Sequence, residues 1–269
     1  MKKSKSILLW VVAFVLMLVL AVYQRMTGPT YPVSGSITFN NEVIKYKLPR
    51  SNDGPGDDII KIRVQNKNVL AYIKYKRFKS NDDWTVKQLR RDDDYLVASI
   101  PEQPPAGKVM YQISLVDFTG NNKTLTDEPV IIRFKGVVPP YILYPHILFM
   151  FVGMVYSLRA GLEAFYKGNK TYAYSLFTMN LMIIGGLILG PIVQYLAFGA
   201  FWTGWPFGHD LTDNKTLLVF IAWIVTVFQL KKHPERKYWA IIATIVTIAV
   251  YLVPHSVLGS EIDYTKLPK

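Results

Sequence analysis

The chain of 269 residues contains no cysteine. This absence excludes disulfide bonds, thiolate metal sites, iron–sulfur ligation and covalent c-type haem attachment to this chain. An exported domain must therefore be stabilised by its core alone. Histidine is scarce as well, with four residues, so a histidine-based site has few candidate ligands.

Apolar residues are abundant, at 51% of the chain, and the mean hydropathy is +0.19. They are concentrated in long runs that approach or exceed the roughly 17–25 residues a helix needs to cross a bilayer. The runs cover residues 7–23, 141–158, 172–197, 217–230 and 238–257. The sequence therefore predicts a membrane α-helical protein with about five transmembrane helices.

A polar region of ordinary domain size separates the first run from the others. It holds 17 Lys and Arg against 13 Asp and Glu, so it carries only +4 of the net charge of +12. This balance argues against nucleic-acid binding, which favours a basic stripe on a folded domain. We expect three parts: a transmembrane anchor (1–27), an exported β-sandwich domain (28–138) and a four-helix transmembrane domain (139–269) with an outer loop at 198–216.

The remaining positive charge lies in short segments that flank the apolar runs. Short segments rich in Lys and Arg stay on the cytoplasmic side. The start of the chain, the loop after Leu158 (Arg159, Lys167 and Lys170 against Glu163) and the loop after Leu230 all fit this rule. They predict a multi-pass protein of the bacterial cytoplasmic membrane, with the β-domain and the loop 198–216 outside. The first run lacks a clean small-x-small cleavage site, which favours a retained anchor over a signal peptide.

Short runs of alternating apolar and polar residues in the exported region predict eight strands. They lie at residues 36–39, 43–48, 59–64, 69–78, 84–89, 95–100, 109–117 and 130–134. Asn40 and Asn41 are placed to form the turn of a hairpin. The segments YLVASIP (95–101), PPAGKVMYQI (104–113) and VDFTGN (116–121) resemble the late strands of immunoglobulin- or fibronectin-III-like modules. This resemblance implies an inserted all-β immunoglobulin-like sandwich.

The loop FGAFWTGWPFGHDLTDNKT (198–216) is the densest group of aromatic and polar residues in the membrane part. Topology places His146 and His255, each preceded by proline, near the outer ends of their apolar runs, on the same side as His209 in this loop. Ionisable residues near hydrocarbon are functional candidates, and neutral imidazole commonly binds metals and haem iron. A packed aromatic belt with incidental histidines is the alternative.

This arrangement resembles the haem-handling membrane proteins of cytochrome c biogenesis. In that family an outward loop of the form WGxxWxWD is flanked by haem-ligating histidines on neighbouring helices. The resemblance spans residues 141–263 and implies His146 and His255 as axial ligands. It further implies a haem shelf and loop contacts formed by Trp202, Trp205, Phe207 and Asp210.

The loop departs from the family pattern, because His209 precedes Asp210 where tryptophan is expected. This departure opens a second option, in which a transition metal ion such as copper or zinc is bound by His146, His209, His255 and Asp213. The predicted function is cofactor handling or electron transfer in the assembly of cytochromes or respiratory complexes.

The alternative function is a non-catalytic envelope interaction protein or membrane-complex subunit. Under either function the expected partners are membrane lipid and envelope or respiratory-chain proteins. We find no acid/base pair or nucleophile arrangement that predicts an enzyme.

Overall fold

The computed structural model describes residues 3–254 and 259–266. The chain divides into two compact units. A helical unit is built from the parts of the chain that flank the strands, and a strand unit from residues 30–137 together with the short segments 197–199 and 260 onward. The second unit therefore includes a C-terminal segment that is distant in sequence.

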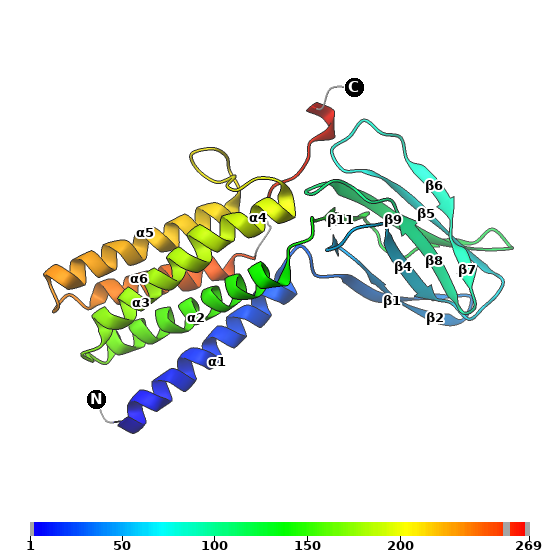
Figure 1. Cartoon of the computed structure of the whole chain (residues 1–269). Coiled ribbons are helices and arrows are strands. Elements are labelled where there is room, and N and C mark those ends of the chain that lie inside the picture. Colours follow the sequence, from blue (N-terminus) through cyan, green and yellow to red (C-terminus); the bar gives the residue numbers. More distant parts are fainter. Residues whose placement is uncertain (1–2, 255–258, 267–269) are drawn as a thin grey trace. The chain divides into compact units, whose positions relative to one another are not determined.

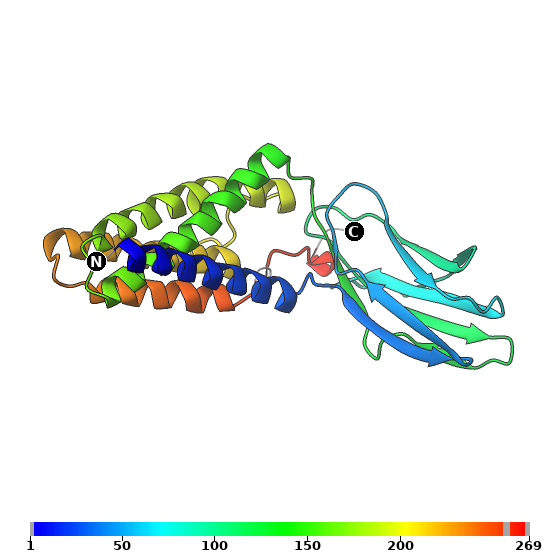
Figure 2. The ribbon, with the colours of Figure 1, turned by 90° about the horizontal axis from the view of Figure 1, so that it is seen from below.

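The helical unit contains four helices that are long and apolar enough to cross a membrane (Figures 1 and 2). These are α1 (Lys3–Thr27), α2 (Pro140–Phe165), the continuous helix from Thr171 to Phe198, and α5 (Leu211–Lys232). The predicted fifth span corresponds to α6 (Tyr238–Leu252), which has 15 residues and is shorter than a typical span.

The third of these helices is not uniform. It runs as α3 (Thr171–Met182), continues through the π-helical turns η1 (Ile183–Leu189) and ends as α4 (Gly190–Phe198). A π-helical segment inside an α-helix is rare and is often found at functional sites. Its glycines allow close packing, because a Cβ atom on Gly185 would lie 2.9 Å from Cβ of Phe149 in α2.

Helix α2 packs against α1, α3 and α6. Side-chain hydrogen bonds link helices inside this apolar bundle, as is common where lipid supplies no water. Thr244 Oγ1 donates to the carbonyl oxygen of Ser157 at 2.8 Å, and Trp223 Nε1 donates to Thr247 Oγ1 at 2.9 Å. Gly161 is required at its position, because a Cβ there would lie 2.6 Å from Thr244 Oγ1.

The sequence-based assignment of Arg159 and Glu163 to a loop is wrong. Both residues belong to the last turns of α2, which extends to Phe165, and both side chains are buried. They form an i,i+4 ion pair with 2.7 Å between Arg159 Nη1 and Glu163 Oε2. Pairing makes burial of the two charges possible, so the charged residues continue the helix instead of ending it.

The strand unit contains eleven strands within the described residues, and each of the eight expected strands overlaps one of them. The additional strands are short: β3 (Ser51–Asn52), β7 (Arg90–Asp92) and β10 (Asn122–Thr124). The others are β1 (Val33–Phe39), β2 (Glu42–Leu48), β4 (Asp58–Arg63), β5 (Val69–Arg77), β6 (Thr85–Gln88), β8 (Tyr95–Ile100), β9 (Lys108–Asp117) and β11 (Val130–Phe134).

The strands form three sheets with the orders β1-β2, β3-β11-β9-β5-β6 and β4-β8-β7, and β10 pairs with β9 (Figure 1). All pairings are antiparallel except that of β11 with β3. The predicted hairpin is confirmed: β1 and β2 are joined by Asn40 and Asn41, whose φ angles are 48° and 62°. Positive φ at both central positions is typical of a type I′ turn.

Buried side chains from all three sheets form one apolar core. The alternation on β5 places Val69, Ala71 and Ile73 inward, whereas the intervening residues Leu70 and Tyr72 are more exposed. The C-terminal segment joins this unit through Ser260, whose carbonyl oxygen accepts from Arg133 Nη2, and through Glu261, which pairs with Lys79 and Lys108.

Candidate functional site

The loop that follows α4 is held at both ends by its own residues. It leaves the helix through Gly199, whose φ of 81° favours glycine. It reaches α5 at Asp210, which caps the helix by accepting from the backbone N–H of Thr212 at 2.8 Å. The N–H of Asp210 in turn donates to the carbonyl oxygen of Thr203 at 2.9 Å. The aromatic segment is therefore a closed loop with a defined geometry.

Asp213, in the first turn of α5, accepts the hydrogen bonds that hold this loop. Its side chain is buried, and Oδ2 accepts from the N–H groups of Thr203 at 2.6 Å and Gly204 at 2.9 Å. Gln194 of α4 donates to the same oxygen at 3.0 Å. Hydrogen bonds to a charged group are the stronger ones in proteins. Asp213 thus holds the loop against the end of α4, and its Oδ2 atom already accepts from four donors, the fourth being the hydroxyl of Thr203 at 3.3 Å.

The aromatic residues of the loop differ in their exposure. Trp202 Nε1 donates to the carbonyl oxygen of Trp205 at 3.0 Å, and Phe201 stacks on Tyr195 with 4.3 Å between ring centroids. In contrast, Trp205 is 68% exposed and Phe207 is 82% exposed. Two large aromatic rings therefore project from the loop.

His146 lies in the second turn of α2, where it contacts the π-helical segment. Its Nδ1 atom is 2.9 Å from the carbonyl oxygen of Gly185, which also accepts from the N–H of Gly190. A carbonyl oxygen only accepts, so Nδ1 must carry the proton, and in the neutral ring Nε2 is then the atom with the free lone pair. Metal-ligating histidines almost always have this arrangement, with the second nitrogen donating to a carbonyl or carboxylate.

Lys215 connects the first turns of α5 to the end of α6. The side chain is 7% exposed, and Nζ donates to the carbonyl oxygens of Val253 at 2.7 Å and Pro254 at 3.2 Å. A cation suits the C-terminal end of a helix, where carbonyl groups lack helical partners. Lys215 therefore holds the residue that precedes His255, and His255 itself lies outside the described residues.

The remaining predicted ligands are dispersed. His209 lies exposed in the loop next to Asp210. Within residues 3–254 and 259–266, no three or more His, Asp or Glu side chains are grouped so that they could hold a metal ion. The structure thus places Trp202, Trp205 and Asp210 in one loop that Asp213 of α5 holds, and it gives His146 a partner in η1.

No protein-family model matches the chain, and no curated protein is significantly similar to it. The resemblance to haem-handling membrane proteins accordingly rests on the loop 198–216 and on His146 and His255 alone, and it stays a prediction.

Sequence reasoning missed the partners that position these residues. Gly185 and Gln194 hold His146 and Asp213, and Lys215 holds the end of α6. The adjacent glycines 185 and 186 in an apolar run were the available signal for a close approach between helices. No pattern in the sequence indicated that Asp213 would bind backbone N–H groups ten residues away.

Proposed function

We propose that this chain is a multi-pass protein of a bacterial cytoplasmic membrane that holds haem at the outer membrane face. Its role is cofactor handling or electron transfer during assembly of cytochromes or respiratory complexes. The strand unit is an immunoglobulin-like sandwich on the extracytoplasmic side. Helix α1 of the helical unit is a retained anchor, because it buries Ala13 and Met17 in that unit.

The hydrogen bond between His146 and Gly185 is the observation that carries this proposal. It leaves Nε2 of a neutral imidazole available as an iron ligand and orients the ring through a backbone atom of η1. His255 would supply the second histidine ligand. Trp202, Trp205, Phe207 and Asp210 would contact the haem, with the exposed rings of Trp205 and Phe207 offering stacking surfaces. Bound haem would supply one-electron redox chemistry.

The metal-ion alternative uses His146, His209, His255 and Asp213 with copper or zinc. It is less well supported, because Oδ2 of Asp213 already accepts from Thr203, Gly204 and Gln194. A metal ion bound by this carboxylate would have to bind Oδ1 or displace one of the loop hydrogen bonds to Oδ2.

The experiment is an absorption spectrum and metal analysis of the detergent-purified protein, before and after titration with haem. Titration is included because a haem carrier can be isolated empty. We expect a Soret band that is lost in His146→Ala and in His255→Ala. The matched control is His233→Ala, since His233 lies in the basic loop between α5 and α6.

The outcomes separate the alternatives. Stoichiometric copper or zinc that is lost in His209→Ala and His146→Ala, without a Soret band, would replace haem by the metal version. Protein that binds neither haem nor metal after titration would contradict both.

A non-catalytic interaction role is the second candidate, and strand β6 favours it. β6 is the outer strand of its sheet, and all four of its residues are exposed. Beside it, the ammonium groups of Lys74 and Lys76 lie 5.2 Å and 5.4 Å from the ring centroid of Trp84. An exposed edge can accept an added strand from a partner. Crosslinking from a photoreactive residue at Thr85 to an envelope protein, abolished by Val86→Pro, would support this role.

A further inference from the structure

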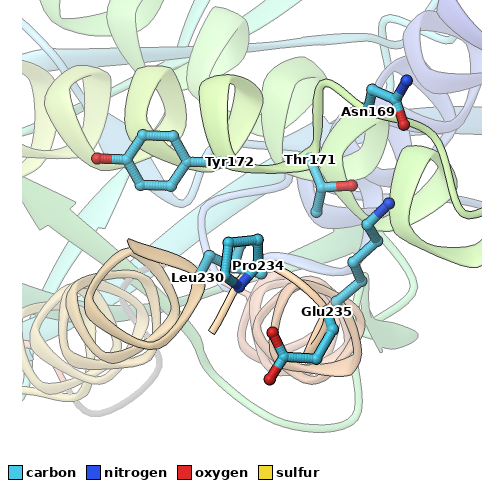
Figure 3. Close-up of a pocket in the computed structure, with 7 residues that line it drawn as sticks. Asn169, Thr171, Tyr172, Leu230, Pro234 and Glu235 are labelled. Carbon is cyan, nitrogen blue, oxygen red and sulfur yellow. The ribbon is translucent and has the colours of Figure 1, made fainter. Parts of the chain in front are cut away.

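A cavity of about 330 Å³ opens between two loops of the helical unit (Figure 3). None of its lining residues belongs to the aromatic loop. One loop joins α2 to α3, and the other joins α5 to α6. Both polar and apolar groups line the cavity. The lining residues are Asn169, Thr171, Tyr172, Leu230, Pro234, Glu235 and Lys237.

The two loops carry a strong excess of positive charge. The cations of the loops and of the last turn of α5 are Lys167, Lys170, Lys231, Lys232, Arg236 and Lys237. The acidic residue at the cavity is Glu235, whose carboxylate is 3.4 Å from His233 Nδ1 and 3.8 Å from Arg236 Nε. In Figure 3 this carboxylate points away from Asn169 and Thr171. Glu163, the other nearby acid, is already paired with Arg159. The cavity therefore suits an anion.

Hydrogen bonds from Lys237 hold the two loops of the cavity wall together. Its Nζ donates to the carbonyl oxygens of Lys167 at 3.1 Å and Gly168 at 2.8 Å, which ties the two loops to each other. Gly168 cannot be replaced, since a Cβ there would lie 2.0 Å from Glu163 Oε1. An ammonium group has three donors, so Lys237 retains one donor and its charge for a ligand.

The apolar part of the lining identifies the kind of anion. Leu230 is buried beneath the cavity, and Pro234 and the ring of Tyr172 lie beside it (Figure 3). A free inorganic ion gains nothing from these groups, whereas a glycerol backbone and the first methylenes of an acyl chain bury apolar surface there. Basic pockets between transmembrane helices on the cytoplasmic side are known binding places for anionic lipid head groups.

We propose that this cavity binds the phosphate head group of an anionic phospholipid. Lys237 contacts the phosphate, the Asn169 amide donates to it, and Tyr172, Leu230 and Pro234 contact the glycerol region. The site is independent of any cofactor at the aromatic loop. Because the two loops also carry the charge that predicts the cytoplasmic side, the lipid comes from the inner leaflet.

The test measures lipid binding to delipidated full-length protein by native mass spectrometry and by the rise in melting temperature. The probes are phosphatidylglycerol, phosphatidylcholine and inorganic phosphate. We expect phosphatidylglycerol to bind and protect, phosphatidylcholine to bind at least about fivefold more weakly, and phosphate to protect only weakly, since one lysine near an anionic head group contributes about a fivefold change in binding.

Three variants separate the cavity from diffuse charge. Lys237→Gln removes a charge but keeps donors for the Lys167 and Gly168 carbonyls, and Asn169→Trp fills the cavity without changing charge. Each should weaken phosphatidylglycerol binding about fivefold or more. Lys232→Gln is the matched control, because Lys232 lies over Phe228 and does not line the cavity; it should change binding less than twofold.

Two results would overturn the proposal. Equal losses in Lys232→Gln and Lys237→Gln, with no effect of Asn169→Trp, would mean that loop charge acts without a site. Protection by inorganic phosphate equal to that by phosphatidylglycerol would make the ligand a free phosphate instead of a lipid. Melting temperatures without lipid show whether any variant is simply unfolded.

Discussion

The guanidinium of Arg159 lies 2.7 Å from the carboxylate of Glu163, one turn further along α2, and both side chains are buried. The guanidinium carbon also lies 4.8 Å from the ring centroid of Tyr174, and Nη2 contacts Ser6 Oγ at 3.3 Å. Glu163 Oε1 accepts from the N–H of Lys170 at 3.1 Å. This pair therefore joins α1, α2 and α3 at the ends of these helices.

Removing one member of the pair should destabilise the protein strongly. Glu163→Gln or Arg159→Met leaves an uncompensated buried charge, for which the expected loss in the free energy of unfolding is about 3–5 kcal/mol. The double variant Arg159→Met/Glu163→Leu should recover much of the loss. Thermal unfolding in detergent measures it.

The control for this comparison is Arg236→Gln. Arg236 is exposed, and its contact with Glu235 is 3.8 Å long, so the change should be below about 1 kcal/mol. A single variant as stable as the wild-type protein would show that the buried pair does not hold the helices together.

Asp213 and Asp210 should respond differently to neutralisation. Asp213→Ala removes the acceptor of two backbone N–H groups and of Gln194, with an expected cost of about 1.5–3 kcal/mol for each hydrogen bond to a charged group. The loop should then exchange its amide hydrogens faster at residues 203–208. Asp210→Asn should cost less than Asp213→Ala, because asparagine can still cap α5 by accepting from the N–H of Thr212.

Hydrogen exchange followed by mass spectrometry on the two variants makes this comparison. The role of Asp213 would be refuted by unchanged exchange at Thr203 and Gly204 in Asp213→Ala.

The attachment of residues 260–266 to the strand unit should depend on pH. Burial alone would raise the pKa of Glu261, but the hydrogen bonds from Lys108 and Lys79 outweigh burial and lower this pKa below its ordinary value of 4.5. A lowered pKa in the folded state means that Glu261 stabilises the attachment above pH 4.5. This stabilisation is lost as the pH falls through the folded-state pKa.

Limited proteolysis of the C-terminal segment between pH 3 and pH 7, an interval of about four units around the ordinary pKa, tests this dependence. Cleavage should accelerate at the acidic end in the wild-type protein. Glu261→Gln should be cleaved faster throughout and lose the pH dependence. Asp127→Asn removes one negative charge elsewhere in the strand unit and should keep the pH dependence of cleavage. The same acid response in Glu261→Gln would assign the effect to another group.

The absence of cysteine allows a direct test of topology with single introduced cysteines. Thr85→Cys in β6 and Phe207→Cys in the aromatic loop are exposed positions. With the loops of Lys and Arg inside, both should react with a membrane-impermeant maleimide in intact spheroplasts. His233→Cys, in the basic loop, should react only after lysis. Labelling of His233→Cys in intact spheroplasts would reverse the orientation proposed above.

The sequence predicted the local structure well where it depends on residues close together in the chain. The alternation of Ala71 and Ile73 with Tyr72 and Lys74 predicted β5, and Asn40-Asn41 predicted the β1–β2 hairpin. These patterns are readable because side chains alternate across a strand and because asparagine tolerates positive φ. Apolar run length likewise predicted the helices of the membrane part.

The same reasoning failed where the partner is distant or the role depends on packing. Arg159 and Glu163 were assigned to a loop because charge usually ends an apolar helix, yet pairing buries both inside α2. Asp213 was interpreted only as a metal ligand, which stays a prediction, and its Oδ2 atom also accepts from backbone N–H groups of the loop. Nothing in the local pattern distinguishes a carboxylate that binds a ligand from one that binds the chain itself.

By itself, then, the sequence determined the strands, the hairpin, the long apolar helices and the loop rich in tryptophan, since periodicity, run length and turn residues act over a few positions. Only the tertiary structure decided which nitrogen of His146 is free, because its partner Gly185 lies 39 residues away in a π-helical turn. It also decided that Lys237 lines a cavity between two loops and ties them together through the carbonyl oxygen of Gly168. Such pairings follow from how separate segments pack, and packing is a property of the whole folded chain.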